Sequence, residues 1–136
     1  MIIAEFDLPV YFIQEFKRKA PKTHFVGMNW YRNAHFSMQT TIKDHYHKLI
    51  ANLLEPLMLP DQCPLMSYKM SYTYFYKNVT SDMPNVCSIA SKFANDALQE
   101  LGYVIDDNVQ YLCEEHHYVG GRDSSNPRIH VVLETL

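Results

Sequence analysis

The clearest hydrophobic pattern is an alternation over residues 66–77, MSYKMSYTYFYK. The even-numbered positions hold Met or Tyr, and the odd-numbered positions, with one exception, hold Ser, Lys or Thr. A period of two predicts a strand with one face in the core. Strands are also expected over residues 2–13, 109–118 and 128–134, and Pro9 indicates that the first of these lies at a sheet edge.

Two other segments show the 3.6-residue period of amphipathic helices. The first helix is predicted from Thr41 to about Leu54, where Thr41 and Asp44 resemble a capping box. Its apolar positions are Ile42, Tyr46, Leu49, Ile50, Leu53, Leu54 and Leu57. The second helix is predicted from about Pro84 to Leu101, because Pro suits the first turn of a helix.

The remaining segments have the composition of connections. Residues 17–35 are basic, aromatic and rich in turn formers, which predicts a loop with a short strand near His24–Met28. Residues 119–127, VGGRDSSNP, are typical of a hairpin loop between the last two strands. The resulting order predicts one α+β domain, residues 1–136, in which two main helices pack on one face of a small mixed β-sheet.

Composition narrows the class of protein. A hydrophobic content of 47% with 20% charged residues excludes intrinsic disorder. No apolar run approaches the roughly 18–20 residues of a membrane span, and the first residues lack the basic start and cleavage site of a signal peptide. The three cysteines are odd in number and widely spaced, so they predict no disulfide framework and favour a reducing compartment.

Charge is unevenly distributed along the chain, whose net charge is −3. Residues 1–80 contain nine Lys or Arg and six Asp or Glu, a balance of +3, whereas residues 81–136 contain three and nine, a balance of −6. This division fits a basic binding surface beside a carboxylate-rich site. It also fits ordinary solvated faces.

Three aspartates flank the second predicted helix, with Asp82 at its start and Asp106 and Asp107 just after its end. The ends of strands and helices are where a rigid scaffold presents functional groups. Carboxylates that meet there are hard oxygen ligands for Mg²⁺ or Mn²⁺. The structural alternatives are a helix N-cap for Asp82 and turn chemistry for the Asp pair.

Other polar residues are placed by the same elements. Lys92 follows Asn85 by seven residues, so the two share a helix face, and Asp96 is expected to pair with Lys92 one turn later. Glu114 and Glu115 alternate across a strand, so only one of them can face a site on the helix side. Motifs typical of zinc sites, P-loops and serine hydrolases are absent.

Residues 82–112, DMPNVCSIASKFANDALQELGYVIDDNVQYL, resemble the signature of RusA-like Holliday junction resolvases. That signature has an Asp-x-Asp-Asn motif entering a helix, a Lys on the helix, then Asp-Ala-Leu, Gly and an Asp-Asp pair. The matching residues are Asp82, Asn85, Lys92, Asp96, Ala97, Leu98, Gly102, Asp106 and Asp107. Residues 28–35 and 120–132 resemble, more loosely, the N-terminal and C-terminal regions of phage members of the family.

The resemblance implies a small α+β homodimer that binds four-way DNA junctions and cuts opposing strands symmetrically, with Mg²⁺ as the cofactor or Mn²⁺ in its place. It also implies a phage- or prophage-encoded enzyme in the cytoplasm of a bacterial host. Lys92 and Asn85 are expected to serve catalysis beside the metal. The expected metal ligands are Asp82 and Asp107, assisted by Asp106 or Glu114.

DNA contacts are expected from basic and aromatic residues. The expected phosphate contacts are Lys17, Arg18, Lys19, Lys22, Arg32, Lys69 and Lys77. Trp30 and Tyr31 are expected to stack on bases at an open junction. The structural alternatives are a solvated strand face for Lys69 and Lys77 and core packing for the two aromatic residues.

Two departures from the family pattern leave other functions open. Pro84 stands where the family has a second Asp, so one family metal contact is missing. Either Glu114, Asp106 or the Asn85 amide replaces that contact, or the site holds one ion rather than two, or none. Lys92 lies about one helical turn further along than in the founding type, which returns it to the same face. The alternative functions are a non-catalytic branched-DNA-binding module of the same fold and a small phage protein that blocks a host factor.

Overall fold

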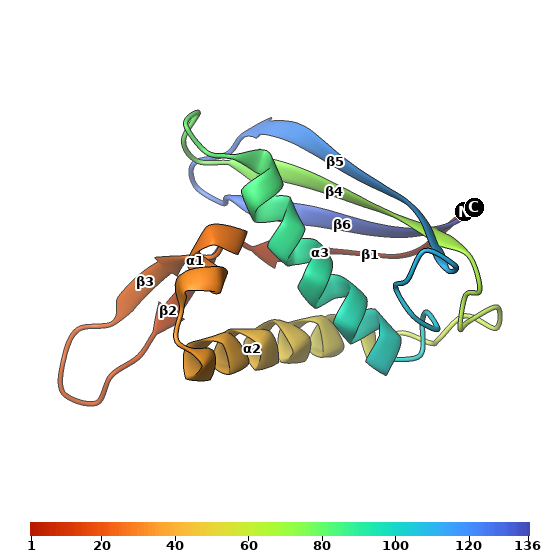
Figure 1. Ribbon diagram of the computed structural model, residues 1–136, viewed down its shortest axis with the longest axis horizontal. Helices are drawn as coiled ribbons and strands as arrows, with labels where there is room; N and C mark the ends of the chain where they lie inside the picture. The colour runs from red at the N-terminus through yellow and green to blue at the C-terminus, as the bar shows by residue number, and fades with distance from the viewer.

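A four-stranded mixed sheet forms the centre of the molecule, which is described over residues 1–136 by a computed structural model (Figure 1). Its strands, in spatial order, are β1 (Ile2–Pro9), β6 (Arg128–Thr135), β4 (Tyr68–Tyr76) and β5 (Leu112–Arg122). β6 runs antiparallel to both β1 and β4, and β5 runs parallel to β4. The edge position predicted for the first strand from its Pro9 is confirmed.

β4 owes its central place to the alternation in its sequence. Its side chains Tyr68, Met70, Tyr72 and Tyr74 are buried, whereas the alternate positions remain partly exposed. A parallel neighbour requires a crossover connection, and α3 (Met83–Glu100) provides it between β4 and β5. The C-terminal end of β4 therefore lies near the start of α3, and the N-terminal end of β4 lies near the end of α3. Polar groups gather at these two ends.

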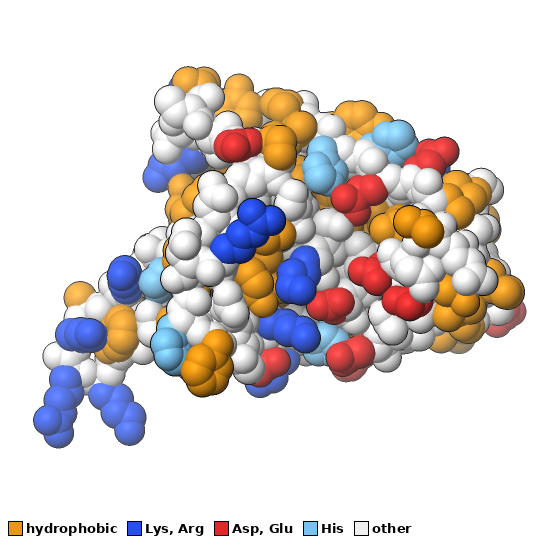
Figure 2. All heavy atoms as spheres, in the orientation of Figure 1, with side chains coloured by type: hydrophobic (Ala, Val, Ile, Leu, Met, Phe, Trp, Pro, Cys, Tyr) orange, Lys and Arg blue, Asp and Glu red, His pale blue; other side chains and the backbone are white.

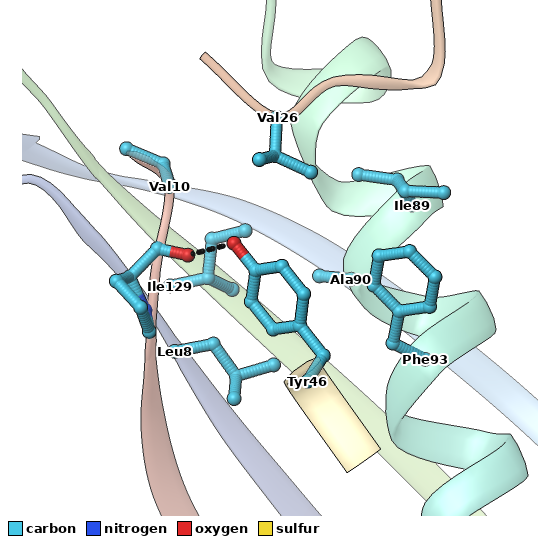
Figure 3. A pocket seen from close by; sticks show the side chains of 9 residues that line it. Leu8, Val10, Val26, Tyr46, Ile89, Ala90, Phe93 and Ile129 are labelled. Carbon is cyan, nitrogen blue, oxygen red and sulfur yellow. Dashed lines mark hydrogen bonds between the residues drawn. The ribbon is translucent and has the colours of Figure 1, made fainter. Parts of the chain in front are cut away.

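Two long helices, α2 (Phe36–Leu54) and α3, cover one face of the sheet, as predicted (Figure 1). The face of each helix that meets the sheet is apolar, and one core cluster of 27 buried residues joins helices and sheet. The hydroxyl of Tyr46 on α2 donates to the carbonyl of Pro9 at 2.6 Å, beside a gap of about 10 Å³ (Figure 3). This gap is lined almost entirely by hydrophobic side chains and is too small and apolar for a ligand.

The start of α2 differs from the prediction. The helix begins at Phe36, and His35 caps it by accepting a hydrogen bond from the Ser37 backbone at 3.2 Å. The Thr41 hydroxyl instead donates to the carbonyl of Ser37 at 2.9 Å, inside the helix. The predicted capping box of Thr41 and Asp44 is therefore wrong, because the first buried position of the helix, Ile42, comes well after the helix has begun at Phe36.

The segment predicted as a loop, residues 17–35, contains more structure than its composition indicates. It contains β3 (Lys22–Phe25) and α1 (Met28–Asn33). β3 pairs with β2 (Tyr11–Gln14) in an antiparallel arm that projects from the body of the molecule (Figure 1). The single strand predicted over residues 2–13 is therefore divided at Val10 between β1 and β2, which belong to different sheets. The short strand was expected a few residues later, and the helix was not expected. Both elements are short, which leaves little periodicity to detect.

The connection near the C-terminus was also predicted incorrectly. Residues 119–122 belong to β5, and β5 and β6 lie on opposite sides of β4, so they form no hairpin. The Gly-rich sequence is typical of a turn, but Gly120 sits close to the side chains of Thr73 and Phe75, where a larger residue would clash. Its lack of a side chain serves strand packing here.

Candidate nucleic-acid interface

A polar cleft of about 420 Å³ lies where the arm, the end of β4 and the start of α3 meet. Its lining residues are Tyr11, Phe25, Tyr74, Lys77, Asn78, Thr80, Ser81, Asp82 and Asn85. The arm supplies two aromatic side chains, the turn after β4 supplies Lys77 and two hydroxyl groups, and α3 supplies a carboxylate and an amide. Positive, negative and aromatic groups thus face one cleft.

Asp82 occupies the N-cap position of α3 with an extended backbone. Its side chain makes no cap hydrogen bond, and it forms no ion pair. Asp82 therefore occupies the N-cap position, as the structural alternative expects, but its carboxylate does not cap the helix and is exposed at the cleft. Both carboxylate oxygens are left available to a ligand.

Asn85 has a positioning role. Its side-chain oxygen accepts a hydrogen bond from the backbone of Asn29 at 2.8 Å and so ties α1 to α3. A β-carbon on Gly27 would lie within 2.9 Å of the Asn85 side chain, so glycine is needed for this close approach. With its oxygen engaged, Asn85 fixes the wall of the cleft beside Asp82.

Two hydroxyl groups that line the cleft, those of Tyr74 and Ser81, are hydrogen-bonded to each other. Tyr74 is buried, and its hydroxyl lies 2.7 Å from that of Ser81. Burial raises the pKa of Tyr74, and the hydrogen bond to Ser81 partly opposes that shift. Tyr74 therefore stays neutral, and Lys77 and Asp82 are the charged groups at the cleft.

The arm carries a group of basic side chains beyond the cleft. Lys17, Arg18, Lys19 and Lys22 are all exposed on the arm and its connecting loop. Figure 2 shows blue side chains at the end of the projecting arm, without red ones among them. Lys19 packs its ammonium 4.2 Å from the ring of Phe16, and none of the four forms an ion pair. These four residues, hereafter the basic arm, are free to contact phosphates.

A second group of carboxylates lies beyond the other end of α3. Asp106 accepts hydrogen bonds from the backbone of Asp107 at 2.7 Å and from the side chain of Asn108 at 3.0 Å, as the turn alternative expects. The pKa of Asp107 is raised by desolvation, by its hydrogen bond with Asp106, and by the charges of Asp106 and Asp96. This crowding of like charges makes the region the acidic end of the molecule.

The structure does not bring the four predicted metal ligands together within one chain. Asp82 and Asp107 flank a helix of 18 residues, a separation of about 27 Å along its axis. Glu114 pairs with His116 at 3.0 Å, whereas its neighbour Glu115 accepts from Ser91 of α3 at 2.6 Å. Glu115, and not Glu114, therefore lies on the helix-covered face. The structure has no group of three or more His, Cys, Asp or Glu side chains arranged to hold a metal ion.

The donor set of the cleft fits magnesium only as a site that a phosphate ligand completes. Mg²⁺ usually keeps several waters and is held by one or two carboxylates together with substrate phosphates. Asp82 supplies one such carboxylate, and the hydroxyls of Thr80 and Ser81 lie nearby. A phosphate next to Lys77 would supply a further oxygen ligand, and waters would complete the set.

Other predicted site residues are dispersed. Lys92 is exposed on α3, about 15 Å along the axis from Asp82, and forms no ion pair with Asp96. Lys69 lies at the far end of β4 from the cleft, with its ammonium 4.0 Å from the Glu134 carboxylate. Arg32 is exposed in the last turn of α1.

The two aromatic residues expected to stack on bases are engaged elsewhere. The Trp30 indole donates to His24 at 3.2 Å, and the Tyr31 ring meets Phe93 edge-on with centroids 5.6 Å apart. Core packing, the structural alternative, accounts for both. The aromatic pair at the cleft is instead Tyr11 and Phe25, whose only sequence signal was their place in short apolar stretches.

Comparison with known proteins adds no assignment: the chain matches no protein-family model and no curated protein. None of its helices combines the length and the apolar character required to cross a membrane.

Proposed function

We propose that this protein is a magnesium-dependent endonuclease that resolves four-way DNA junctions by paired cuts. The observation that carries the proposal is the cleft at the start of α3, where a free carboxylate, Asp82, and an ammonium group, Lys77, lie beside the basic arm. The resemblance of residues 82–112 to RusA-like resolvases supports the same activity. It also implies a phage or prophage gene product that acts in bacterial cytoplasm.

In this proposal the protein residues bind and orient the DNA. The basic arm holds the phosphate backbone of one DNA branch, which makes binding salt-dependent. Lys77 binds the phosphate that enters the cleft, and Asp82 would hold the magnesium ion. When bound, magnesium acts as a Lewis acid that neutralises phosphate charge and lowers the pKa of a coordinated water.

In this proposal Asp106 and Asp107 of one chain contribute to the active site of a second chain. Their separation from Asp82 by the length of α3 prevents them from sharing its ion within one chain. A homodimer has a second copy of each group, and a two-fold dimer also matches the symmetry of the junction. We therefore assign the cleft of one chain and the acidic end of the other to each active site.

The non-catalytic branched-DNA-binding module is the second candidate. Two observations favour it: Pro84 lacks a ligand atom, and a single chain gathers only one carboxylate at the cleft. In this alternative the basic arm and the cleft bind DNA without cutting it.

A labelled four-way junction and a matched duplex, each with Mg²⁺ or with EDTA, distinguish the two candidates. Paired symmetrical nicks in the junction alone, abolished by EDTA, are expected for the endonuclease. Junction binding without nicks in either Mg²⁺ or Mn²⁺ would establish the binding module instead.

Mixing two inactive variants tests the shared site. Dimers that combine an Asp82→Asn chain with an Asp107→Asn chain contain one site with both changes and one with neither. We expect the mixture to recover single-strand nicking that neither variant shows alone. No recovery, with exchange of chains verified, would contradict the shared site.

A further inference from the structure

One wall of the cleft is aromatic. Tyr11 and Phe25 are cross-strand neighbours at the base of the arm, with ring centroids 5.5 Å apart and an angle of 55° between the ring planes. Both side chains are only half-buried and both line the cleft. They present a hydrophobic surface to the open space.

The opposite side of the cleft is polar. Lys77 and Asp82 bring charges of opposite sign, and Asn78 and Thr80 are exposed beside them. The volume of about 420 Å³ falls in the range of small-molecule sites, roughly 300–1,000 Å³. A phosphate group alone would use the polar side and leave the aromatic wall without a ligand.

We propose that the cleft holds one unstacked nucleotide, with its base against Tyr11 and Phe25 and its phosphate at Lys77. Every base has a π-face, so an aromatic wall binds a base with little regard to its identity. The inference rests on the proposed function and deepens it. The protein selects DNA in which a nucleotide beside the bound phosphate is already unpaired, as at an open junction.

The surroundings favour a nucleic acid strand over a small anionic ligand. The strands that carry Tyr11 and Phe25 continue outward to the four cations of the basic arm, which are unpaired and exposed. A single small ligand in the cleft would leave those cations without a partner. A polyanionic strand that leaves the cleft along the arm would meet them in turn.

Short single strands test this directly. We would measure the dissociation constants of the wild-type protein for an oligothymidylate of about eight nucleotides, within the size range of single-strand sites, and for an abasic chain of the same length. Loss of base stacking is expected to weaken binding about tenfold or more. Equal affinities for the two chains would overturn the inference without any variant.

Substitutions then locate the stacking surface. Tyr11→Leu and Phe25→Leu are expected to remove the preference for thymidylate while leaving the affinity for the abasic chain unchanged, whereas Phe25→Tyr, which keeps an aromatic ring, is expected to retain the preference. Tyr118→Leu, an exposed aromatic residue on β5, is the matched control. A preference that survives in folded Tyr11→Leu and Phe25→Leu proteins would place the base elsewhere and overturn the inference.

The outcomes separate this inference from the endonuclease proposal. If the protein nicks junctions but binds thymidylate and abasic chains equally, the endonuclease proposal stands and the stacking site is rejected. A protein that prefers thymidylate yet nicks nothing would retain the stacking site and lose the endonuclease.

Discussion

At the residue scale, Asn95 links α3 to the sheet by a buried hydrogen-bond network. It is only 1% exposed. Its amide nitrogen donates to the Ser91 carbonyl at 2.9 Å and to the Tyr72 hydroxyl at 3.3 Å, and its oxygen accepts from the Tyr68 hydroxyl at 2.9 Å. No buried side-chain polar atom in the molecule lacks a partner, so this network is complete.

Replacing this amide is expected to destabilise the fold. Asn95→Ala leaves the buried Tyr72 hydroxyl without this donor and opens a small cavity, so we expect a loss of about 2–4 kcal/mol in the free energy of unfolding. Urea denaturation measures it, with Ser88→Ala on the more exposed face of α3 as control. Equal losses in the two variants would contradict the role of the network.

Near the start of β5, Asp107 in the preceding turn and Glu114 in the strand carry carboxylates whose effects on stability have opposite signs. The pKa of Asp107 is raised, so its ionised form disfavours the folded state at neutral pH, and this cost disappears as the pH falls below the ordinary value of 3.8. The pKa of Glu114 is lowered, chiefly by its hydrogen bond with His116, so its ionised form favours the folded state. This gain in stability is lost as the pH falls from the ordinary value of 4.5 through the lowered pKa.

Thermal unfolding of two variants checks these signs. At about pH 7, Asp107→Asn is expected to raise the midpoint slightly and Glu114→Gln to lower it slightly, because both side chains are exposed and screened. As the pH is lowered towards 3, both differences should shrink, because both carboxylates become protonated. Shifts of the same sign at neutral pH would contradict the assignment.

At the element scale, we propose that the β2–β3 arm makes the first contact with DNA. Its basic residues lie between Tyr11 and Phe25 in the chain, on the loop and strand that continue outward from the cleft. No acidic side chain lies between Phe16 and Asn33. Since each released counterion adds to the salt dependence of binding, the arm is expected to set most of that dependence.

A pair of double variants measures the contribution of the arm. Lys17→Ala with Lys19→Ala is expected to reduce the slope of log K against log salt for junction binding by about two, close to 0.9 for each lost phosphate contact. Lys43→Ala with Lys48→Ala removes the same charge from α2 and is expected to leave the slope unchanged. Equal slopes in the two double variants would exclude the arm from DNA contact.

Elements with one extended buried face were predictable from sequence, and others were not. The alternation of β4 and the apolar stripe of α3 each report on a single buried face, and both were located to within about two residues. The arm and α1 bury little, so their sequences carry little pattern. The parallel pairing of β4 with β5 depends on contacts far apart in the chain, which local patterns do not encode.

The candidate site shows the same limit in a different form. Asp82 was recognised at the start of a helix and Asp107 after its end, but placing both from a single chain in one site overlooked the length of the helix between them. At 1.5 Å per residue, 18 helical residues keep them apart. Tyr11 and Phe25 gave no functional signal, because only the folded arm brings them to the cleft.

At the scale of the whole molecule, the charge asymmetry of the sequence becomes an asymmetry in space. Figure 2 shows blue side chains towards the arm and red ones towards the opposite end. Such a field steers a polyanion to the arm and cleft and away from the acidic end. In a homodimer, the acidic end then meets DNA only where the partner has already positioned a strand.

The central claim, that the cleft at the start of α3 is the catalytic centre, is tested most directly by Asp82→Asn. Its carboxylate is exposed and unpaired, so the fold and the affinity for a four-way junction should be unchanged, while nicking in Mg²⁺ should fall at least a hundredfold. Asp61→Asn, an exposed carboxylate in the loop before β4, should nick like the wild type. Wild-type nicking by Asp82→Asn would show that the catalytic centre lies elsewhere.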